Sequence, residues 1–309
     1  MKDIMIHESS LMKITRLLGF KRFYWSLRRL HVPVNSKALV LEVGAGGNPY
    51  PRANVMLDAL EETVERNEQS LVKDRPLVLG LVEDLPFKDK VFDFVIASHV
   101  LEHTDNPELF LKELMRVGKA GYIETPDGWF EKICAFTYHR LEVSDDNGVL
   151  LINKKSSWKP ESISCFWEKI NSNRKFMYFL RMNPEFYNMR YYWSDTIKYN
   201  ILNPEVDASW DYPAELVARA FTHSRKKFVD ILRDNYLFLR RFFLSQHDRN
   251  RKLNINYLLR CPTCHSDNLI FDNDIVCGEC KAIYSMKGNI YKLFPRKIDG
   301  FNQLRVHVD

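Results

Sequence analysis

The stretch Leu39-Val-Leu-Glu-Val-Gly-Ala-Gly-Gly47 decides the fold, because an apolar strand carrying a carboxylate breaks directly into glycines. Many α/β folds present a nucleotide-containing cofactor in this way. Gly44 and Gly46 let the backbone approach a ligand where side chains would collide with it, and Glu42 can point into the same crevice. A glycine cluster alone is a weak signal, since glycine is also the default residue of tight turns.

The residues after this turn narrow the kind of cofactor. A dinucleotide site needs a helix directly after the glycines, and the two prolines of Asn48-Pro-Tyr-Pro51 leave little room for one. Asp58 ends the next short strand, where a carboxylate can accept hydrogen bonds from both ribose hydroxyls of an adenosine. After the third strand, Glu83-Asp-Leu-Pro-Phe87 offers an acceptor for an adenine amino group beside an apolar residue that can pack on the ring.

Strands alternate with helices from residue 37 to residue 154, which predicts an α/β fold with a mainly parallel sheet. Besides the strand before the glycines, the expected strands lie at 55–57, 77–81, 92–97 and 121–124, and the expected helices lie near 61–73 and after Pro107. Asn147-Gly148 supplies positive φ between two β-prone runs and predicts a β-hairpin over 140–152. We expect this antiparallel pair to end the sheet.

Residues 37 to 154 resemble the class I S-adenosylmethionine-dependent methyltransferases. The matching segments are LEVGAGG, MLD, EDLPF, FDFVIASHVLEH and AGYIETP, in the family's order and at its usual spacings. The resemblance implies a Rossmann-like methyltransferase fold with S-adenosyl-L-methionine as cofactor. It implies that Gly44, Ala45 and Gly46 wrap the methionine end, that Asp58 holds the ribose, that Asp84 and Leu85 read the adenine, and that Ser98 and His99 lie beneath the sulfonium and its amino group.

Methyl transfer from a sulfonium needs little covalent help, so the protein mainly holds the nucleophile in line and can remove its proton. We predict His99, His103 and Asp127 as catalytic residues, with Glu124 and His139 as further candidates for a base. A hydrogen-bonded structural role stays open for each of them. No Asn/Asp-Pro-Pro-aromatic tetrapeptide follows the fourth strand, which favours an oxygen or carbon acceptor over an amino group.

The run His99-Val-Leu-Glu-His103 also matches the HxxEH pattern of zinc peptidases, in which two histidines one helical turn apart bind the metal. It lies where the resembling family has its loop after the fourth strand, and no distant third ligand is evident. We therefore do not expect a peptidase.

The six cysteines include a tight group of four near the C-terminus, which indicates metal binding and not disulfides. Cys261-Pro-Thr-Cys264 and Cys277-Gly-Glu-Cys280 are separated by twelve residues, a spacing that closes a tetrahedral zinc site. Four thiolates leave no open position, so we expect structural Zn²⁺ and no redox role. The flanking residues resemble the small zinc-ribbon activator subunit shared by methyltransferases of tRNA, rRNA and release factors, which implies a stabilising, substrate-positioning companion.

Five segments are expected along the chain of 309 residues. They are a basic helical region (1–36), the methyltransferase core (37–154), an aromatic-rich insert with a basic helix on the substrate side (155–256), a zinc ribbon (257–296) and a tail (297–309). Apolar positions recur at helical spacing in 7–30, at Leu11, Ile14, Leu17, Leu18 and Trp25, and in 214–244, at Phe228, Ile231, Leu232, Leu239 and Phe242.

The distribution of charge limits the kinds of partner that this chain can bind. Seven Lys or Arg face two acids in the first thirty residues, and nine face three in 220–252, while the whole chain carries +5. These stretches are either solvated helix faces or surfaces for an anionic partner such as RNA or a membrane surface. No apolar run approaches the roughly 18 residues of a membrane span, and the N-terminus lacks a secretory signal, so we expect a cytoplasmic protein without a transmembrane segment.

Three functions are compatible with these features. The first is an S-adenosylmethionine-dependent methyltransferase of a small molecule or saccharide, because aromatic side chains of the insert could stack on a ring. The second is a methyltransferase of RNA or a translation factor, supported by the basic stretches and the zinc ribbon. The third is a regulatory protein that binds the cofactor without turnover. The sequence indicates no oligomeric state.

Overall fold

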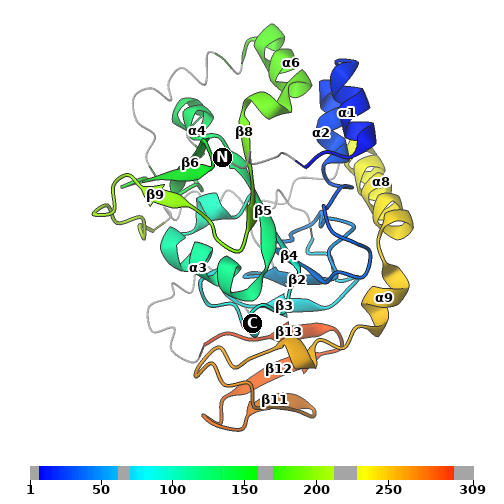
Figure 1. The fold of residues 1–309 in the computed structure, drawn as a ribbon, viewed down its shortest axis with the longest axis vertical. Coiled ribbons are helices and arrows are strands. Elements are labelled where there is room, and N and C mark those ends of the chain that lie inside the picture. Colours follow the sequence, from blue (N-terminus) through cyan, green and yellow to red (C-terminus); the bar gives the residue numbers. More distant parts are fainter. Residues whose placement is uncertain are drawn as a thin grey trace. The chain divides into compact units, whose positions relative to one another are not determined.

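The computed structural model describes residues 7–61, 70–134, 136–158, 170, 172–211 and 228–295 (Figure 1). Its contacts divide the chain into two compact units, each assembled from segments that are distant in sequence. The first unit combines Met1–Asn35, Ala97–Glu108 and Ala120–Pro213, and the second combines Ser36–Ile96, Leu109–Lys119 and Ala214–Asp309.

The second unit holds the predicted parallel sheet. Strands β1 (Val40–Val43), β2 (Val55–Asp58) and β3 (Leu77–Leu79) pair in parallel, and β4 (Phe94–Ser98), which begins in this unit, follows β1 in the sheet order. All residues of β1, β2 and β3 are buried, as expected for a parallel sheet covered on both faces. The predicted strands are confirmed, whereas most of the helix predicted near 61–73 lies outside the described residues.

The four-cysteine module extends the same sheet. Its strands β10 (Leu269–Phe271), β11 (Asp274–Cys277), β12 (Ile283–Lys287) and β13 (Ile290–Lys292) run in this order and end beside β3. β13 pairs in parallel with β3 through three residue pairs. Ile290 and Phe294 pack on a core that includes Met56 and Leu77, so the module shares its hydrophobic core with the glycine turn's domain.

In the first unit, β5 (Ala120–Pro126) pairs antiparallel with β8 (Asn188–Ser194) over seven residue pairs. The predicted hairpin forms as β6 (Leu141–Asp146) and β7 (Val149–Lys154), with positive φ at Asn147 and Gly148. Its predicted place at the end of the main sheet is wrong, because β6 and β7 form a separate sheet with β9 (Tyr199–Ile201). The strand that pairs with β5 is β8 instead. Aromatic residues favour strands, and three of those in β8, Tyr191, Tyr192 and Trp193, are buried.

The predicted N-terminal helical region forms two short helices. Helix α1 (Ser10–Leu17) and α2 (Lys21–Leu27) are separated at Gly19, whose φ is +76°. Of the predicted apolar positions, Leu11, Ile14, Leu17 and Leu18 are exposed and Trp25 is buried. Met12 is buried in a cluster with Tyr24 and Leu27. The other helices are α3 (Pro107–Val117), α4 (Gly128–Cys134), α6 (Arg174–Met182), α8 (Phe228–Leu244) and α9 (His247–Lys252), with short 3-10 turns at Val82–Asp84, Leu101–His103, Pro184–Phe186 and Asn256–Leu258.

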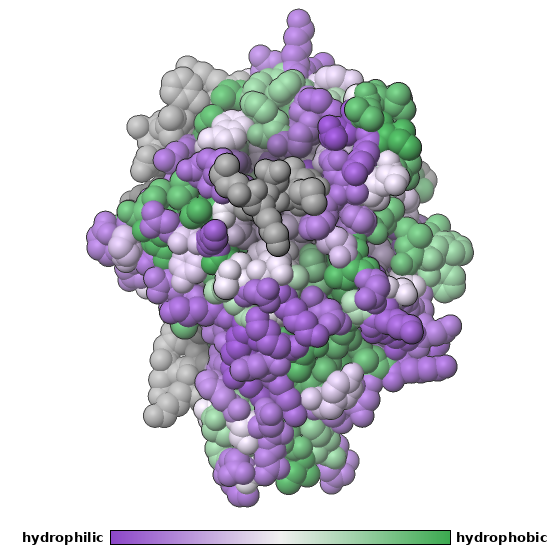
Figure 2. Space-filling view, in the orientation of Figure 1, coloured by the Kyte–Doolittle hydropathy of each residue, from purple (hydrophilic) through white to green (hydrophobic). Residues whose placement is uncertain are grey.

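Helix α8 also presents apolar side chains to solvent. Ile231, Leu232, Leu239 and Phe242 are each about half exposed, while Leu237 is buried. Figure 2 shows hydrophobic side chains at the surface where Figure 1 places this helix. The helix begins at residue 228, the first of the predicted apolar positions. Residues 214–227 lie outside the described part of the chain. Within that part, no helix is long and apolar enough to cross a membrane.

Candidate active site

The glycine turn has the backbone conformation that its sequence requires. Gly44 and Gly46 have φ of +62° and +57°, values that side-chain-bearing residues rarely adopt. The Gly44 N–H donates to the Leu57 carbonyl at 2.8 Å, and the Gly46 N–H donates to Oδ2 of Asp58 at 3.1 Å. The carboxylate predicted to hold a ribose therefore lies against the glycines predicted to wrap the same ligand.

The loop after the turn is not helical between residues 44 and 54, as its two prolines predicted. Buried Glu42 accepts a hydrogen bond from the Tyr50 N–H at 2.7 Å. The fully buried Arg75 donates to the carbonyls of Tyr50 and Ala53 and pairs with Asp74 at 2.7 Å. No sequence pattern pointed to Arg75. Its buried guanidinium donates hydrogen bonds to the loop's carbonyl groups, which would be satisfied within a helix if the loop were helical.

The predicted adenine-reading loop touches the four-cysteine module. Leu85 is buried, and its N–H donates to Glu113 at 2.7 Å. Oδ1 of Asp84 lies 3.2 Å from Nε2 of His265 and 3.7 Å from the Arg260 guanidinium. His265 directly follows Cys264, so the module contacts a residue predicted to bind the cofactor. Spacing alone could not reveal a contact between residues 181 positions apart.

In the first unit, Ser98 is the last residue of β4, and His99 follows it. Oγ of Ser98 is buried and has no hydrogen-bond partner among the described residues. His99 has φ of +57°, a conformation that costs a non-glycine residue about 1–3 kcal/mol and that clusters at ligand sites. Its Nδ1 lies 3.3 Å from Oε1 of Glu102, and its Nε2 lies 3.1 Å from Oε1 of Glu124.

Glu124 is fully buried and forms a two-pronged ion pair with Arg28. The guanidinium Nε and Nη2 donate to the two carboxylate oxygens at 2.6 and 2.5 Å, and the Tyr122 hydroxyl donates to the same carboxylate. Burial by itself raises the pKa of Glu124, but the charge and hydrogen bonds of Arg28 outweigh it and hold that pKa well below its ordinary value. The Arg28 side chain lies over the ring of Trp25 at 4.1 Å.

These carboxylates determine the charge of His99. Desolvation lowers its pKa, but hydrogen bonds to Glu102 and Glu124 and their charges prevail and raise the pKa of His99 to about 9. His99 is therefore an imidazolium at neutral pH, even though 43% of its side chain is exposed. In this charge state both ring nitrogens donate hydrogen bonds to the carboxylates.

The remaining predicted residues are placed differently. Asp127 precedes α4, where Oδ1 accepts hydrogen bonds from the Trp129 N–H at 3.2 Å and the Ser144 hydroxyl at 2.9 Å. This is the arrangement of a helix N-cap. His103 does not pair with His99, as the HxxEH pattern would require; its neighbour is His139, with ring centroids 4.8 Å apart.

A cavity of about 880 Å³ opens in the first unit, a size typical of small-molecule sites. The rings of Tyr24 and Trp25 and the cationic side chains of Lys13, Arg16, Lys21 and Arg190 line it, together with Glu8 and Glu185. Arg16 and Lys21 pair with these two acids at 3.1 and 3.3 Å. Sequence reasoning missed this cavity because Tyr24 of α2 and Arg190 of β8 are 166 residues apart.

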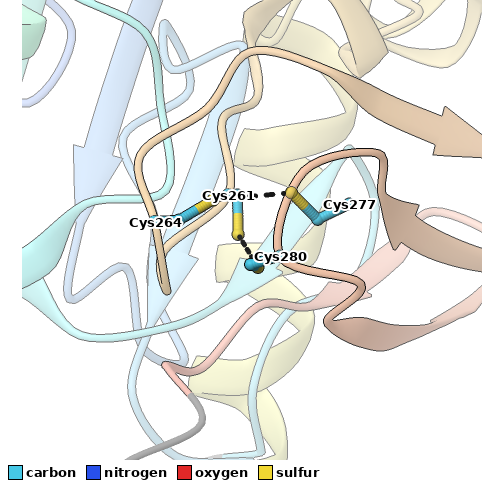
Figure 3. A group of neighbouring side chains, drawn as sticks. All are labelled: Cys261, Cys264, Cys277 and Cys280. Atoms are coloured by element: carbon cyan, nitrogen blue, oxygen red, sulfur yellow. Dashed lines mark hydrogen bonds between the residues drawn. The ribbon is translucent and has the colours of Figure 1, made fainter.

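The four cysteines converge as their spacing predicted (Figure 3). Their sulfur atoms lie within 4.8 Å of one another, with Cys261 to Cys280 at 3.6 Å and Cys264 to Cys277 at 3.5 Å. Four sulfurs at the usual Zn–S distance around a tetrahedral ion are about 3.8 Å apart. The donor set and its geometry therefore fit a closed zinc site.

Comparison with known proteins identifies the part of the chain that carries the glycine turn. Residues 41–123 match the family model of a methyltransferase domain. An uncharacterised protein of Methanocaldococcus jannaschii is 33% identical over 94 residues, which is 29% of this chain and 43% of that protein. An uncharacterised methyltransferase of Schizosaccharomyces pombe is 40% identical over 70 residues, which is 21% of this chain and 25% of that protein. The chain thus spans less than half the length of these relatives.

Among solved structures, the chain is similar to one from the complex of the Haloferax volcanii Trm112 methyltransferase activator. The TM-score is 0.35, with 18% identity over 60% of this chain and 95% of that one. The strand order β3-β2-β1-β4-β5 and the match to a methyltransferase domain confirm the predicted fold class, a Rossmann-like α/β fold.

Proposed function

We propose that this chain is an S-adenosylmethionine-dependent methyltransferase whose acceptor is a small molecule with a ring and an anionic group. The methyltransferase domain at residues 41–123 supports the reaction class. The lining of the cavity carries the proposal for the acceptor. The second candidate, an RNA or a translation factor, rests on the resemblance of the zinc module and on the two basic stretches.

The residues around the glycine turn fit the cofactor, which supplies an activated methyl group when bound. Gly44, Ala45 and Gly46 would hold its methionine end, with Glu42 beneath them, and Asp58 would accept the ribose hydroxyls. Asp84 and Leu85 would hold the adenine, and the buried, unpartnered Oγ of Ser98 would find its hydrogen bond on the ligand.

The proposed role of His99 follows from its charge. A protonated imidazole fixed between two carboxylates has both of its N–H groups engaged, so it would act on a ligand through its positive charge. That charge would attract an acceptor oxygen or a ligand carboxylate and orient it for in-line transfer. His103 and Asp127 remain proposed contributors, Asp127 through the start of α4, where it holds Trp129.

One atom in the cavity favours an anionic acceptor. Nη1 of Arg190 is buried and has no hydrogen-bond partner within the described part of the chain, while Nη2 of the same guanidinium donates to the Tyr24 hydroxyl at 2.8 Å. The guanidinium lies 5.0 Å from the centre of the Trp25 ring, which also faces Arg28. A carboxylate or phosphate beside a stacked ring would satisfy the buried N–H. Because Arg16, Lys21 and Arg28 are engaged with acids, the N-terminal basic stretch is a weaker surface for RNA than its sequence predicted.

Four cysteines in closed geometry support a structural zinc ion in the C-terminal module. The module pairs with β3 through β13 and contacts Asp84 through His265, so it would stabilise the cofactor loop of its own chain. This role corresponds to a built-in companion subunit.

Replacing Asp58 with alanine is expected to weaken S-adenosylmethionine binding at least about tenfold, since charge-assisted hydrogen bonds contribute roughly 1.5–3 kcal/mol. Isothermal titration calorimetry with the cofactor measures the change. Asp89→Ala is the matched control, because Asp89 is 69% exposed and pairs at the surface with Arg116 and, at 3.8 Å, with Arg260. Wild-type affinity in Asp58→Ala would disprove the assignment of this carboxylate.

Incubation with methyl-labelled cofactor and fractionated cell extract tests the acceptor. We expect label in an anionic small-metabolite fraction, and we expect Arg190→Gln to lower that labelling at least about tenfold while cofactor binding is unchanged. Lys37→Gln, which changes an exposed lysine outside the cavity, is the control. Label in RNA or protein instead would establish the second candidate function, and no label in any fraction would contradict an enzyme.

A further inference from the structure

A second group of metal-binding side chains lies in the first unit, separate from the cysteines. Glu102, His103 and His139 each place one ligand atom within 4.8 Å of the other two. Glu102 and His103 belong to the 3-10 turn after β4, and His139 precedes β6. The chain thus brings together a third ligand that lies 36 positions beyond the HxxEH pattern, while His99 of that pattern turns toward Glu124.

The hydrogen bonds behind both imidazoles fix the same tautomer. Nδ1 of His139 donates to Oε2 of Glu131 at 2.7 Å, and Nδ1 of His103 donates to the Tyr138 carbonyl at 3.2 Å. A carbonyl or an ionised carboxylate can only accept, so Nδ1 carries a proton, and in the neutral ring Nε2 carries the lone pair that a metal would use. Metal-binding histidines are held in this way by a carboxylate or a backbone carbonyl.

Glu102 supplies an independent observation. The residue is buried, and its Oε1 accepts the hydrogen bond from His99. Its Oε2 is buried too and has no hydrogen-bond partner among the residues described. Leaving a charged oxygen unsatisfied in the interior is costly, and a cation between it and the two imidazoles removes that cost.

We propose that Glu102, His103 and His139 bind a divalent transition-metal cation. Two imidazoles and one carboxylate are the ligands of catalytic zinc and of non-haem iron(II) sites, where they leave coordination positions open. Water or an oxygen atom of a bound molecule can fill those positions. Binding of the cation requires neither the methyl donor nor an acceptor, so it can be measured independently of the proposed function.

Zinc titration of the full chain tests the proposal. Protein that already holds one Zn²⁺ per chain by elemental analysis is titrated with zinc chloride in a calorimeter. We expect a further equivalent in the wild type and none in the double variant His103→Ala/His139→Ala. His31→Ala, which removes an imidazole of the same unit outside the cluster, should retain the further equivalent. Glu131→Gln should bind it roughly 10–100-fold more weakly, because Glu131 orients His139.

Cobalt gives a measurement that needs no substitution. Co²⁺ added to the zinc-loaded wild type should produce visible ligand-field absorption without sulfur-to-metal charge transfer, because nitrogen and oxygen are its ligands. Charge-transfer bands would place the ion at the cysteines and overturn the proposal. Absence of a further equivalent in the wild type, or its persistence in the double variant, would overturn it as well.

Discussion

Cys261→Ser/Cys264→Ser is expected to unfold the C-terminal module and to weaken S-adenosylmethionine binding at least about tenfold. A structural zinc ion contributes about 10–16 kcal/mol in comparable zinc-finger peptides, far more than a module of some forty residues can replace by packing. Calorimetric titration with the cofactor and limited proteolysis of residues 257–295 measure the two effects. A chelator strong enough to remove zinc should reproduce both in the wild type.

The effect should reach the cofactor site because the module is part of the same sheet. Loss of β13 would expose the backbone edge of β3 and remove Ile290 and Phe294 from the core that contains Ala45 of the glycine turn. It would also remove His265 and Arg260 from Asp84. Cys134→Ala is the control, since Cys134 is buried in a core cluster of the first unit with Phe130 and Leu180. Unchanged cofactor affinity after the module has been proteolysed would refute this coupling.

The sequence predicts the part of the fold whose signals are local. Gly44 and Gly46 had to be glycines because the backbone there is left-handed, and Asn147-Gly148 forms its turn for the same reason. Buried parallel strands are continuous apolar runs, so their positions follow from the sequence. The four cysteines converge because their spacing alone suffices to close a metal site.

What depends on distant partners could not be predicted. Periodicity placed Leu11, Ile14 and Leu17 at helical spacing, but it could not show that Met12 is the residue that packs inside. The aromatic run of β8 has no clean alternation because it is buried on both faces beside β5. The candidate site shows the same limit: His99 and Glu124 were both candidates, but Arg28, which keeps Glu124 ionised, lies 96 residues from Glu124.

Glu124→Gln is expected to lower the free energy of unfolding of the first unit by about 3–5 kcal/mol, because it leaves the charge of Arg28 buried without its partner. Glutamine keeps the size of the side chain, so the change isolates the charge. Urea unfolding followed by circular dichroism measures it. Glu142→Gln is the control: Glu142 pairs with an exposed lysine at 3.7 Å, and such surface pairs contribute about 0–1 kcal/mol.

A double variant separates the cost of an orphaned charge from the contribution of the pair. Arg28→Met/Glu124→Leu removes both charges, and replacing a buried ion pair by apolar residues is often neutral or stabilising. It should therefore be more stable than Glu124→Gln, and a further loss of stability would show that the pair itself holds α2 to β5.

The pH dependence of the difference between wild type and Glu124→Gln follows from two opposite shifts. The pKa of Glu124 is lowered, so its carboxylate stabilises the fold above its ordinary value of 4.5, and this contribution is lost as the pH falls toward the folded-state pKa. The pKa of His99 is raised to about 9, so its charge contributes fully below its ordinary value of 6.5 and is lost as the pH rises through 9. The stability difference should be largest between pH 4.5 and 6.5 and narrow on both sides. A difference that stays constant up to pH 10 would mean that His99 is not held as an imidazolium by these carboxylates.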